Sequence, residues 1–297
     1  MPEAAVRAAI AAGGGVGAQR WHVREGSLSL ARPLLIGILN CTPDSFSDGG
    51  RYLAPDAALA RAAEMEAEGA DVIDVGGEST RPGAPEVGAA EEWCRIGPVV
   101  EALAVGGSRV SVDTSKSEVA RRALEAGACI LNDVSGLRAD PAIGDLAGAS
   151  GAGLVLMHMR GNPRTMQSDV AYADLVGEVA EALRAATDEA IRRGCEPGQL
   201  VIDPGIGFGK SARGSLELLG KIDAIAELGY PVLVGPSRKS FIGETLGLPL
   251  DERVEGTVAA CVAAYVRGAR LFRVHDVAEV RRALDLTAAL ETARTDA

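Results

Sequence analysis

The sequence predicts an α/β fold, a single-domain (β/α)8 barrel with an N-terminal hairpin or extension. Eight short apolar runs alternate with longer segments of helical periodicity, which matches the number of units and the size of such a barrel. The runs are continuously apolar, and this indicates strands that are buried on both faces. An open, doubly wound sheet would give the same periodicity, but the number of units favours the barrel.

The amino-terminal residues differ in composition from the rest of the chain. Residues 1–20 combine an Ala-rich stretch with a run of glycines, and we expect a flexible extension there. Trp21–Leu30 alternates apolar and polar residues around Glu25 and Gly26, which is typical of a small hairpin. We expect this hairpin to close the bottom of the barrel, and residues 21–297 to form one domain.

Each of the eight apolar runs is bounded by polar or glycine residues, as expected of a short buried strand. The predicted strands are Leu34–Leu39, Val72–Val75, Val110–Val112, Cys129–Leu131, Leu154–Met157, Leu200–Ile202, Pro231–Val234 and Leu271–Val274. Between them, Ala171–Arg193 has the clearest helical period, with Leu175, Val179 and Leu183 on one face and charged residues on the other. Gly194 is expected to end this helix, because glycine readily follows a last helical turn.

The charge balance limits the classes of partner. The chain has a formal net charge of −11, so a general nucleic-acid binder is excluded, and any anionic ligand must meet a local cluster of basic residues. No stretch approaches the roughly 18 apolar residues that a membrane span needs, so we expect no membrane partner.

Cysteine and histidine usage argues against a disulfide framework and a zinc site. No two of the five cysteines form a C-x-x-C pair, and there are only three histidines. The cysteines are Cys41, Cys94, Cys129, Cys195 and Cys261. This pattern fits a reducing compartment, and we expect the protein in the cytoplasm.

Polar residues follow every predicted strand, and in a barrel these strand ends converge on the face where active sites lie. Three short acids and amides at the strand tips suit the N–H edge of a heterocycle: Asp113, Asn132 and Asp203. Four cationic residues, expected on loops, suit a phosphate group: Arg81, Lys239, Arg273 and His275.

Some of these polar residues have structural explanations. Asp133 and Asp276 are interpreted as helix caps, a common role for an aspartate after a strand. Gly205–Ser211 ends in Gly-Lys-Ser as a P-loop does, but Pro204 stands where that motif requires glycine. A nucleotide-hydrolase interpretation is therefore weak.

Taken in order, the strand-end segments resemble those of the dihydropteroate synthase family, from about residue 21 to about residue 290. The matching segments are Gly37–Gly50 (GILNCTPDSFSDGG), Asp74–Gly83 (DVGGESTRPG), Ser111–Lys116 (SVDTSK), Leu131–Gly136 (LNDVSG), Leu156–Gln167 (LMHMRGNPRTMQ), Asp203–Lys210 (DPGIGFGK), Gly235–Phe241 (GPSRKSF) and Arg273–Val277 (RVHDV). Eight such segments in the same order make the resemblance specific. One departure is Cys41, where the family more often has valine; we interpret this cysteine as small apolar packing.

The resemblance implies a TIM barrel that acts as a homodimer in folate synthesis and is a sulfonamide target. Such an enzyme couples 6-hydroxymethyl-7,8-dihydropterin diphosphate to p-aminobenzoate and releases diphosphate and 7,8-dihydropteroate. Mg2+ accompanies the diphosphate. Residues 21–297 would then be a pterin-binding catalytic domain.

The resemblance also implies a role for each matching residue. Asn40 contacts the metal and the diphosphate. The pterin ring is held by Asp113, Asn132, Met157, Asp203 and Lys239. The diphosphate lies near Thr80, Arg81, Arg273 and His275, and Val274 is a further substrate-binding residue. The p-aminobenzoate wall is formed by Phe208, Lys239 and Ser240. Two mobile loops contribute Phe46, Asp48 and Pro82.

The implied chemistry breaks a C–O bond to diphosphate and forms a C–N bond. Because arylamines are weak nucleophiles, we expect an SN1-like path in which cations stabilise the leaving group and acids stabilise the pterin cation. The expected catalytic residues are Asp48, Asp113, Lys239 and Arg273. A pterin-binding methyltransferase of the same fold is the alternative, and a catalytically inactive barrel that serves as a partner subunit is a second.

Overall fold

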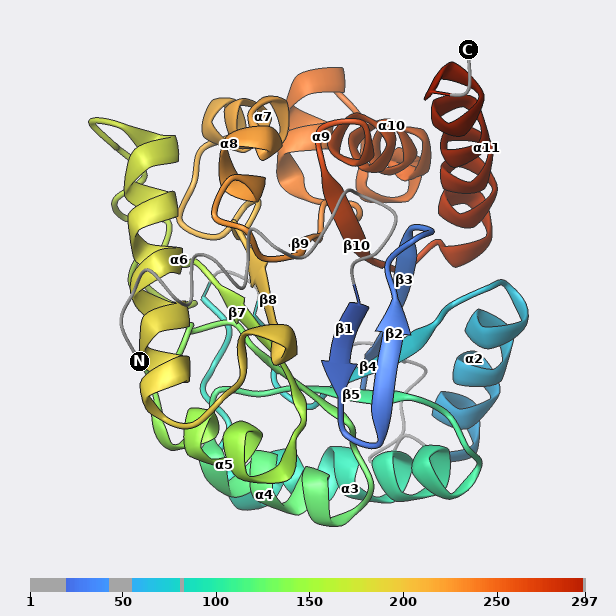
Figure 1. Ribbon diagram of the computed structural model, residues 1–297, viewed down its shortest axis with the longest axis vertical. Helices are drawn as coiled ribbons and strands as arrows, with labels where there is room; N and C mark the ends of the chain where they lie inside the picture. Colours follow the sequence, from blue (N-terminus) through green and yellow to red (C-terminus); the bar gives the residue numbers. More distant parts are fainter. Residues whose placement is uncertain (1–19, 43–54, 81–82, 296–297) are drawn as a thin grey trace.

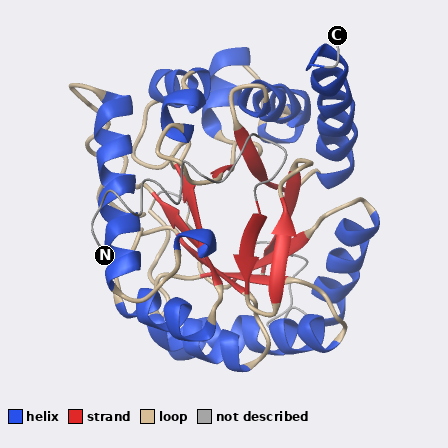
Figure 2. Cartoon of the chain, viewed as in Figure 1, coloured by secondary structure: helices blue, strands red, loops and turns tan. Residues whose placement is uncertain are grey.

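The computed structural model describes residues 20–42, 55–80 and 83–295, and these form a closed barrel of eight parallel strands inside a ring of helices (Figures 1 and 2). The strands follow one another in chain order, and the last pairs with the first. They are β3 (Leu34–Asn40), β4 (Val72–Gly76), β5 (Val110–Asp113), β6 (Ile130–Asp133), β7 (Gly153–Met157), β8 (Leu200–Asp203), β9 (Val232–Val234) and β10 (Ala269–Val274). The predicted (β/α)8 barrel is confirmed.

Helices cover the outside of the barrel between successive strands (Figure 2). They are α2 (Pro55–Ala67), α3 (Ala89–Val105), α4 (Ser117–Glu125), α5 (Ala142–Ser150), α6 (Leu175–Arg192), α7 (Ala212–Gly220), α8 (Ile222–Ala226), α9 (Ser240–Leu246), α10 (Val254–Tyr265) and α11 (Val277–Thr295), with short 3-10 turns η1 (Pro197–Gln199) and η2 (Leu250–Glu252). None of the helices in the described part of the chain has the length and apolar character of a membrane span.

The helix expected over Ala171–Arg193 begins later than predicted, at Leu175. Asp174 has extended backbone angles, and its side chain accepts a hydrogen bond from the Gly177 N–H, which makes it the N-cap. Its buried face carries Leu175 and Val179 as predicted, and Gly194 follows the last turn with φ of 94°. The apolar pattern located the helix, while a local side-chain bond determines its start.

The strands alternate between two cores, since successive side chains point to opposite faces. Residues such as Leu35, Ile73 and Phe272 face the helices and join the large outer core. Their neighbours face the barrel interior; the inward layer consists of Leu34, Ile36, Val72, Ile130, Val155, Val201, Leu233 and Leu271. When this alternation continues to the carboxyl ends of the strands, the last inward-facing residues lie at the carboxyl-terminal opening of the barrel, its mouth.

A two-stranded hairpin covers the opposite end of the barrel. Strands β1 (Arg20–Val23) and β2 (Gly26–Ser29) pair in antiparallel fashion, and their apolar residues belong to the interior core. Trp21 is fully buried, and its Nε1 donates to the Gln199 carbonyl at 2.8 Å. The hairpin predicted over Trp21–Leu30 is confirmed, including its position.

Candidate active site

The carboxyl-terminal mouth of the barrel gathers the polar residues that the sequence singled out. Strand alternation directs these side chains inward, above the apolar interior layer. The polar residues are Asn40, Asp113, Asn132, Asp203 and Arg273, and the apolar Met157 lies among them, so that six strands contribute one residue each. All except Asn40 and Arg273 are buried, and those two are half-buried.

Arg273 joins two carboxylates at the mouth. Its Nε donates to Asp74 Oδ2 at 2.6 Å, and its Nη2 donates to Asp113 Oδ2 at 2.8 Å. The Asn132 Nδ2 donates to the same Asp74 oxygen at 3.1 Å. The expectation that Arg273 lies on a loop is wrong, because strand β10 extends through it to Val274.

Asp74 is a site residue that the sequence analysis missed. Its side chain is fully buried in β4, and the second carboxylate oxygen has no hydrogen-bond partner within the described residues. The signal was present in the sequence, because an aspartate stands inside an otherwise apolar strand run, VIDV. A buried carboxylate needs partners, so its presence pointed to a polar network.

Burial changes the acidity of the carboxyls in the mouth. It raises the pKa of Asp113 to about 7; Arg273 opposes this rise, and the neighbouring carboxylates add to it. Burial also raises the pKa of Asp203, while Lys239 and the Gly205 N–H oppose the change. The Gly205 N–H donates to Asp203 Oδ1 at 2.7 Å. The mouth therefore holds one acid, Asp113, that accepts a proton near neutral pH.

Lys239 lies on the loop that follows β9. Its Nζ donates to the Ile206 carbonyl and lies 4.2 Å from the centroid of the Phe208 ring. Burial lowers the pKa of Lys239 to about 8, with the nearby Asp203 opposing the change. The Phe208 ring packs against an apolar cluster formed by Val134, Met157, Met159 and Met166. Of these five residues, Met157 and Phe208 were predicted from the sequence as site residues.

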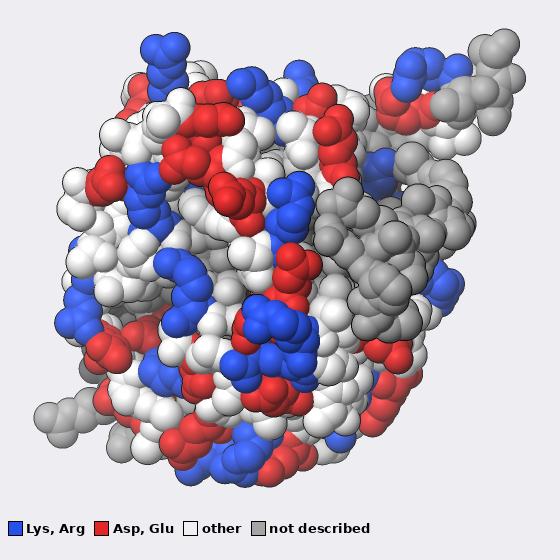
Figure 3. Space-filling view, turned by 60° about the vertical axis from the view of Figure 1, so that its left-hand side comes forward, with Lys and Arg blue, Asp and Glu red and all other residues white. Residues whose placement is uncertain are grey.

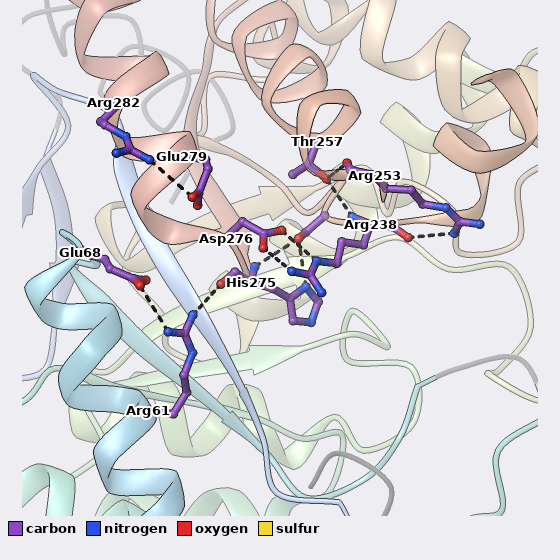
Figure 4. A network of polar contacts seen from close by, with 10 residues as sticks. Arg61, Glu68, Arg238, Arg253, Thr257, His275, Asp276, Glu279 and Arg282 are labelled. Atoms are coloured by element: carbon purple, nitrogen blue, oxygen red, sulfur yellow. Dashed lines mark hydrogen bonds and ion pairs between the residues drawn. The ribbon is translucent and has the colours of Figure 1, made fainter. Parts of the chain in front are cut away.

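The same loop is held by the contacts drawn in Figure 4. Arg238 has a φ of 55°, a conformation that side chains rarely adopt, and its Nε donates to Asp276 Oδ2 at 2.9 Å. Its backbone N–H donates to Thr257 Oγ1 at 2.9 Å. The Ser237 hydroxyl lies 2.9 Å from His275 Nδ1. These bonds fix Lys239 and His275 relative to each other.

Thr80 is half-buried on the loop after β4, and a buried ion cluster anchors that loop. Lys116 Nζ donates to Glu92 Oε2 at 2.6 Å and also to Glu78 Oε2. Glu92 is fully buried on α3, so the cluster ties the loop to the outer helices. Neither glutamate was identified from the sequence, because their pairing depends on contacts between distant segments.

Several expectations have other outcomes. Val274 belongs to the outer core with no exposed surface, so the expectation that its side chain binds substrate is wrong. Asp133 accepts from the Ser135 and Leu137 N–H groups in the turn after β6, so its role is structural, but the prediction that it caps a helix is wrong, because the next helix begins only at Ala142. Asp276 pairs with Arg238. Four predicted residues lie outside the described part of the chain: Phe46, Asp48, Arg81 and Pro82.

Surface charge is mixed on the face of the molecule that Figure 3 shows. On the face in Figure 3, lysine and arginine side chains are interspersed with aspartate and glutamate, and no large area of one sign is visible. An anionic ligand would therefore be bound by local groups at the mouth, where Arg273 and Lys239 are close enough to interact electrostatically.

Comparison with known proteins agrees with this site. The family model described as "Pterin binding enzyme" matches residues 36–275. A dihydropteroate synthase of Synechocystis sp. is 48% identical over 248 residues, covering 83% of this chain and 86% of its own length. The crystal structure of Yersinia pestis dihydropteroate synthase with a sulfonamide drug has a TM-score of 0.87 and 41% identity, covering 92% of this chain and 100% of that one.

A third relative has its product bound. The structure of Burkholderia cenocepacia dihydropteroate synthase complexed with 7,8-dihydropteroate superposes with a TM-score of 0.85 at 41% identity. That alignment covers 94% of this chain and 99% of the other. These similarities extend over nearly the whole barrel.

Proposed function

This chain belongs to the dihydropteroate synthase family, and we propose that the mouth of its barrel carries out the family's reaction with the division of roles given below. The enzyme condenses 6-hydroxymethyl-7,8-dihydropterin diphosphate with p-aminobenzoate, in folate synthesis, to give 7,8-dihydropteroate and diphosphate. The methyltransferase alternative has no support among the relatives.

The pterin ring is the ligand of the strand tips. Asp113, Asn132 and Asp203 offer buried acceptors, and Met157 offers an apolar surface for a ring face. Carboxylates can accept two parallel N–H bonds, which suits the amino-pyrimidinone edge of a pterin. The observation that carries the proposal is the convergence of these polar side chains, all inward-facing, at one level of an otherwise apolar interior.

The family's reaction is linked to a divalent metal ion, and we assign Mg2+ as that ion. The residues described hold no group of three or more His, Cys, Asp and Glu that could bind a metal by itself. Mg2+ is often bound by few protein oxygens together with substrate phosphates, so the half-buried Asn40 amide at the end of β3 fits one ligand position. When bound, the ion would stabilise negative charge on the diphosphate.

The leaving group is received by the cationic residues. Arg273 and His275, with Thr80 and Arg81, would bind the diphosphate as the C–O bond breaks. Electrostatic stabilisation of developing charge is the largest contribution in many enzymes. Breaking this bond first produces a pterin methylene cation, which Asp113 and Asp48 would stabilise in an SN1-like path.

The arylamine acceptor occupies the outer part of the mouth. Phe208, Lys239 and Ser240 form its wall, and the Phe208 ring and Lys239 Nζ already lie 4.2 Å apart. The amine nitrogen attacks the methylene carbon, and a proton leaves the nitrogen. Phe46 and Pro82, on the two loops, would close over the acceptor and exclude water.

We also propose a cytoplasmic homodimer whose catalytic domain is residues 21–297. Hairpin and barrel share one interior core, which supports a single domain. All five cysteines are free, which supports a reducing compartment. A groove of about 330 Å³ between α7, α9 and α10 is lined by Leu216 and Leu246, whose side chains are 44% and 55% exposed. Such an apolar face supports association of two copies.

One assay tests the function. Purified protein is incubated with pterin diphosphate, p-aminobenzoate and Mg2+, and dihydropteroate is measured by chromatography. We expect product that requires both substrates and disappears when the metal is chelated. A folded protein that forms no dihydropteroate under these conditions would contradict the function, and product formation unchanged by chelation would contradict the assignment of the metal.

A further inference from the structure

The loop Gly205–Gly209 carries the Phe208 ring, and side chains from other segments hold it. Four successive carbonyls accept one side-chain donor each: Ile206 from Lys239, Gly207 from Gln167, Phe208 from Lys210 and Gly209 from Tyr172. Gly205 has a φ of 69°, and a Cβ there would lie 1.9 Å from the His158 carbonyl oxygen. The backbone is therefore in close contact with the end of β7.

Lys210 is the buried member of this set, with 3% of its surface exposed. Its Nζ contacts three acceptors: His158 Nδ1 at 2.8 Å, the Phe208 carbonyl at 2.8 Å and the His158 carbonyl at 3.2 Å. No carboxylate forms an ion pair with it in the part of the chain that the structure describes. An ammonium has three donors and no acceptor, so these contacts satisfy it completely.

This arrangement determines the protonation of His158. In its charged form Lys210 can only donate, so Nδ1 offers a lone pair and the ring is neutral with its proton on Nε2. Burial lowers the pKa of Lys210 well below its usual value, and the nearby Asp203 opposes this change and favours the charged form. Burial lowers the pKa of His158 to about 3, and the cations that face it, Lys210, Arg138 and Arg160, act in the same direction. Tyr172 also packs near the ring, with centroids 6.4 Å apart.

We propose that Lys210 and His158 form a positioning pair that fixes the p-aminobenzoate wall. This inference rests on the proposed function, because that function places the acceptor against Phe208. Lys210, which is buried, binds the Phe208 carbonyl of this loop, while Lys239, at the mouth of the barrel, binds the Ile206 carbonyl. Neither Lys210 nor His158 needs to touch the substrate.

The Asp203 carboxylate, the proposed pterin contact, is held by groups other than the Lys210 side chain. The Asp203 carboxylate accepts from the Gly205 N–H at 2.7 Å, and its carbonyl accepts from the His158 N–H at 2.9 Å. Both donors are backbone groups that remain when the Lys210 side chain is replaced. Loss of Lys210 should therefore weaken the binding of p-aminobenzoate and leave the affinity for the pterin substrate nearly unchanged.

Steady-state kinetics of Lys210→Met test this separation. We expect the KM for p-aminobenzoate to rise about tenfold, the change that corresponds to about 1.4 kcal/mol, with pterin diphosphate affinity within about twofold of wild type. Lys221→Met is the matched control: this lysine is exposed and pairs only with Glu217, so its constants should not change. An unchanged KM, or an equal loss of both affinities, would overturn the proposal. Lys210→Gln serves if the methionine variant does not fold.

A second measurement does not depend on activity. Nitrogen-15 NMR of the His158 ring in the wild type should show the neutral Nε2–H form from pH 8 to pH 5. In Lys210→Met, the ring should begin to titrate within this range, because a facing cation has been removed. A wild-type ring protonated on Nδ1 would refute the pair even if dihydropteroate is formed. Absence of product with the expected ring spectrum would instead contradict the proposed function.

Discussion

Arg273→Met should destabilise the protein in a pH-dependent manner. The side chain bonds two buried carboxylates, Asp74 at 2.6 Å and Asp113 at 2.8 Å, and methionine fills similar space without charge. Breaking a buried ion pair by removing one partner costs about 3–5 kcal/mol, since the remaining charge stays buried. We therefore expect the free energy of unfolding to fall by about 4 kcal/mol at pH 8.

The loss should be smaller at lower pH. Because the pKa of Asp113 is raised to about 7 in the folded protein, the folded state binds a proton that the unfolded state has released, and stability decreases as the pH rises from about 4 to 7. Without Arg273 the pKa of Asp113 rises further, because Arg273 lowers it in the wild type. Asp113 is then protonated, and its buried charge removed, over a wider range of pH. At pH 5 the loss should be roughly half of that at pH 8.

Urea unfolding at both pH values measures these differences. Arg270→Met is the matched control, because Arg270 lies on the same strand but, among the described residues, donates to backbone carbonyls alone, those of Tyr265 and Ala269. Its effect should not depend on pH between 5 and 8. The double variant Asp113→Asn/Arg273→Met should recover part of the stability at pH 8. A loss for Arg273→Met that is the same at pH 5 and pH 8 would refute this reasoning.

Three further predictions concern the substrates. Asp203→Asn should lower pterin affinity by about 2–5 kcal/mol, because the amide places a donor against ligand N–H groups; wild-type affinity by calorimetry would contradict this. Lys239→Ala should abolish turnover while the thermal unfolding temperature stays near that of wild type. In the wild type, turnover should decline above pH 8, because the Lys239 ammonium, whose pKa is about 8, then loses its proton. Calorimetry should detect p-aminobenzoate binding only after Mg2+ and diphosphate; equal binding to the free protein would exclude that order.

The sequence alone predicted the barrel and most of the mouth, because both depend on local patterns. Continuous apolar runs located the strands, and polar residues at their ends located the site. Val274 was assigned wrongly because it stands between Arg273 and His275, although adjacent residues on a strand point to opposite faces. Counting alternate positions from Leu271, which faces the interior, places Arg273 inward and Val274 outward.

Other members of the site depend on contacts that no local pattern reveals. Lys210 looked like part of a false P-loop, and only the fold shows that its three acceptors come from the end of β7 and from its own loop. The cluster of Glu78, Glu92 and Lys116 likewise joins segments separated by up to 38 positions. Buried polar groups must be paired, so a sequence indicates that partners exist without identifying them.

The residues proposed to face the pterin and those proposed to form the p-aminobenzoate wall are supported in different ways. Substitutions in the two groups should therefore have different effects. The side chains proposed to face the pterin stand on strands fixed between two cores, and Arg273 joins one of their carboxylates, Asp113, to the buried Asp74. Changes there should alter stability and ligand affinity together. The p-aminobenzoate wall is a loop held by side chains that bind its carbonyls, so its supports can be removed while the strands keep their places. With the proposed roles, we therefore expect acceptor recognition to be separable from pterin recognition, and pterin recognition to be inseparable from the stability of the barrel.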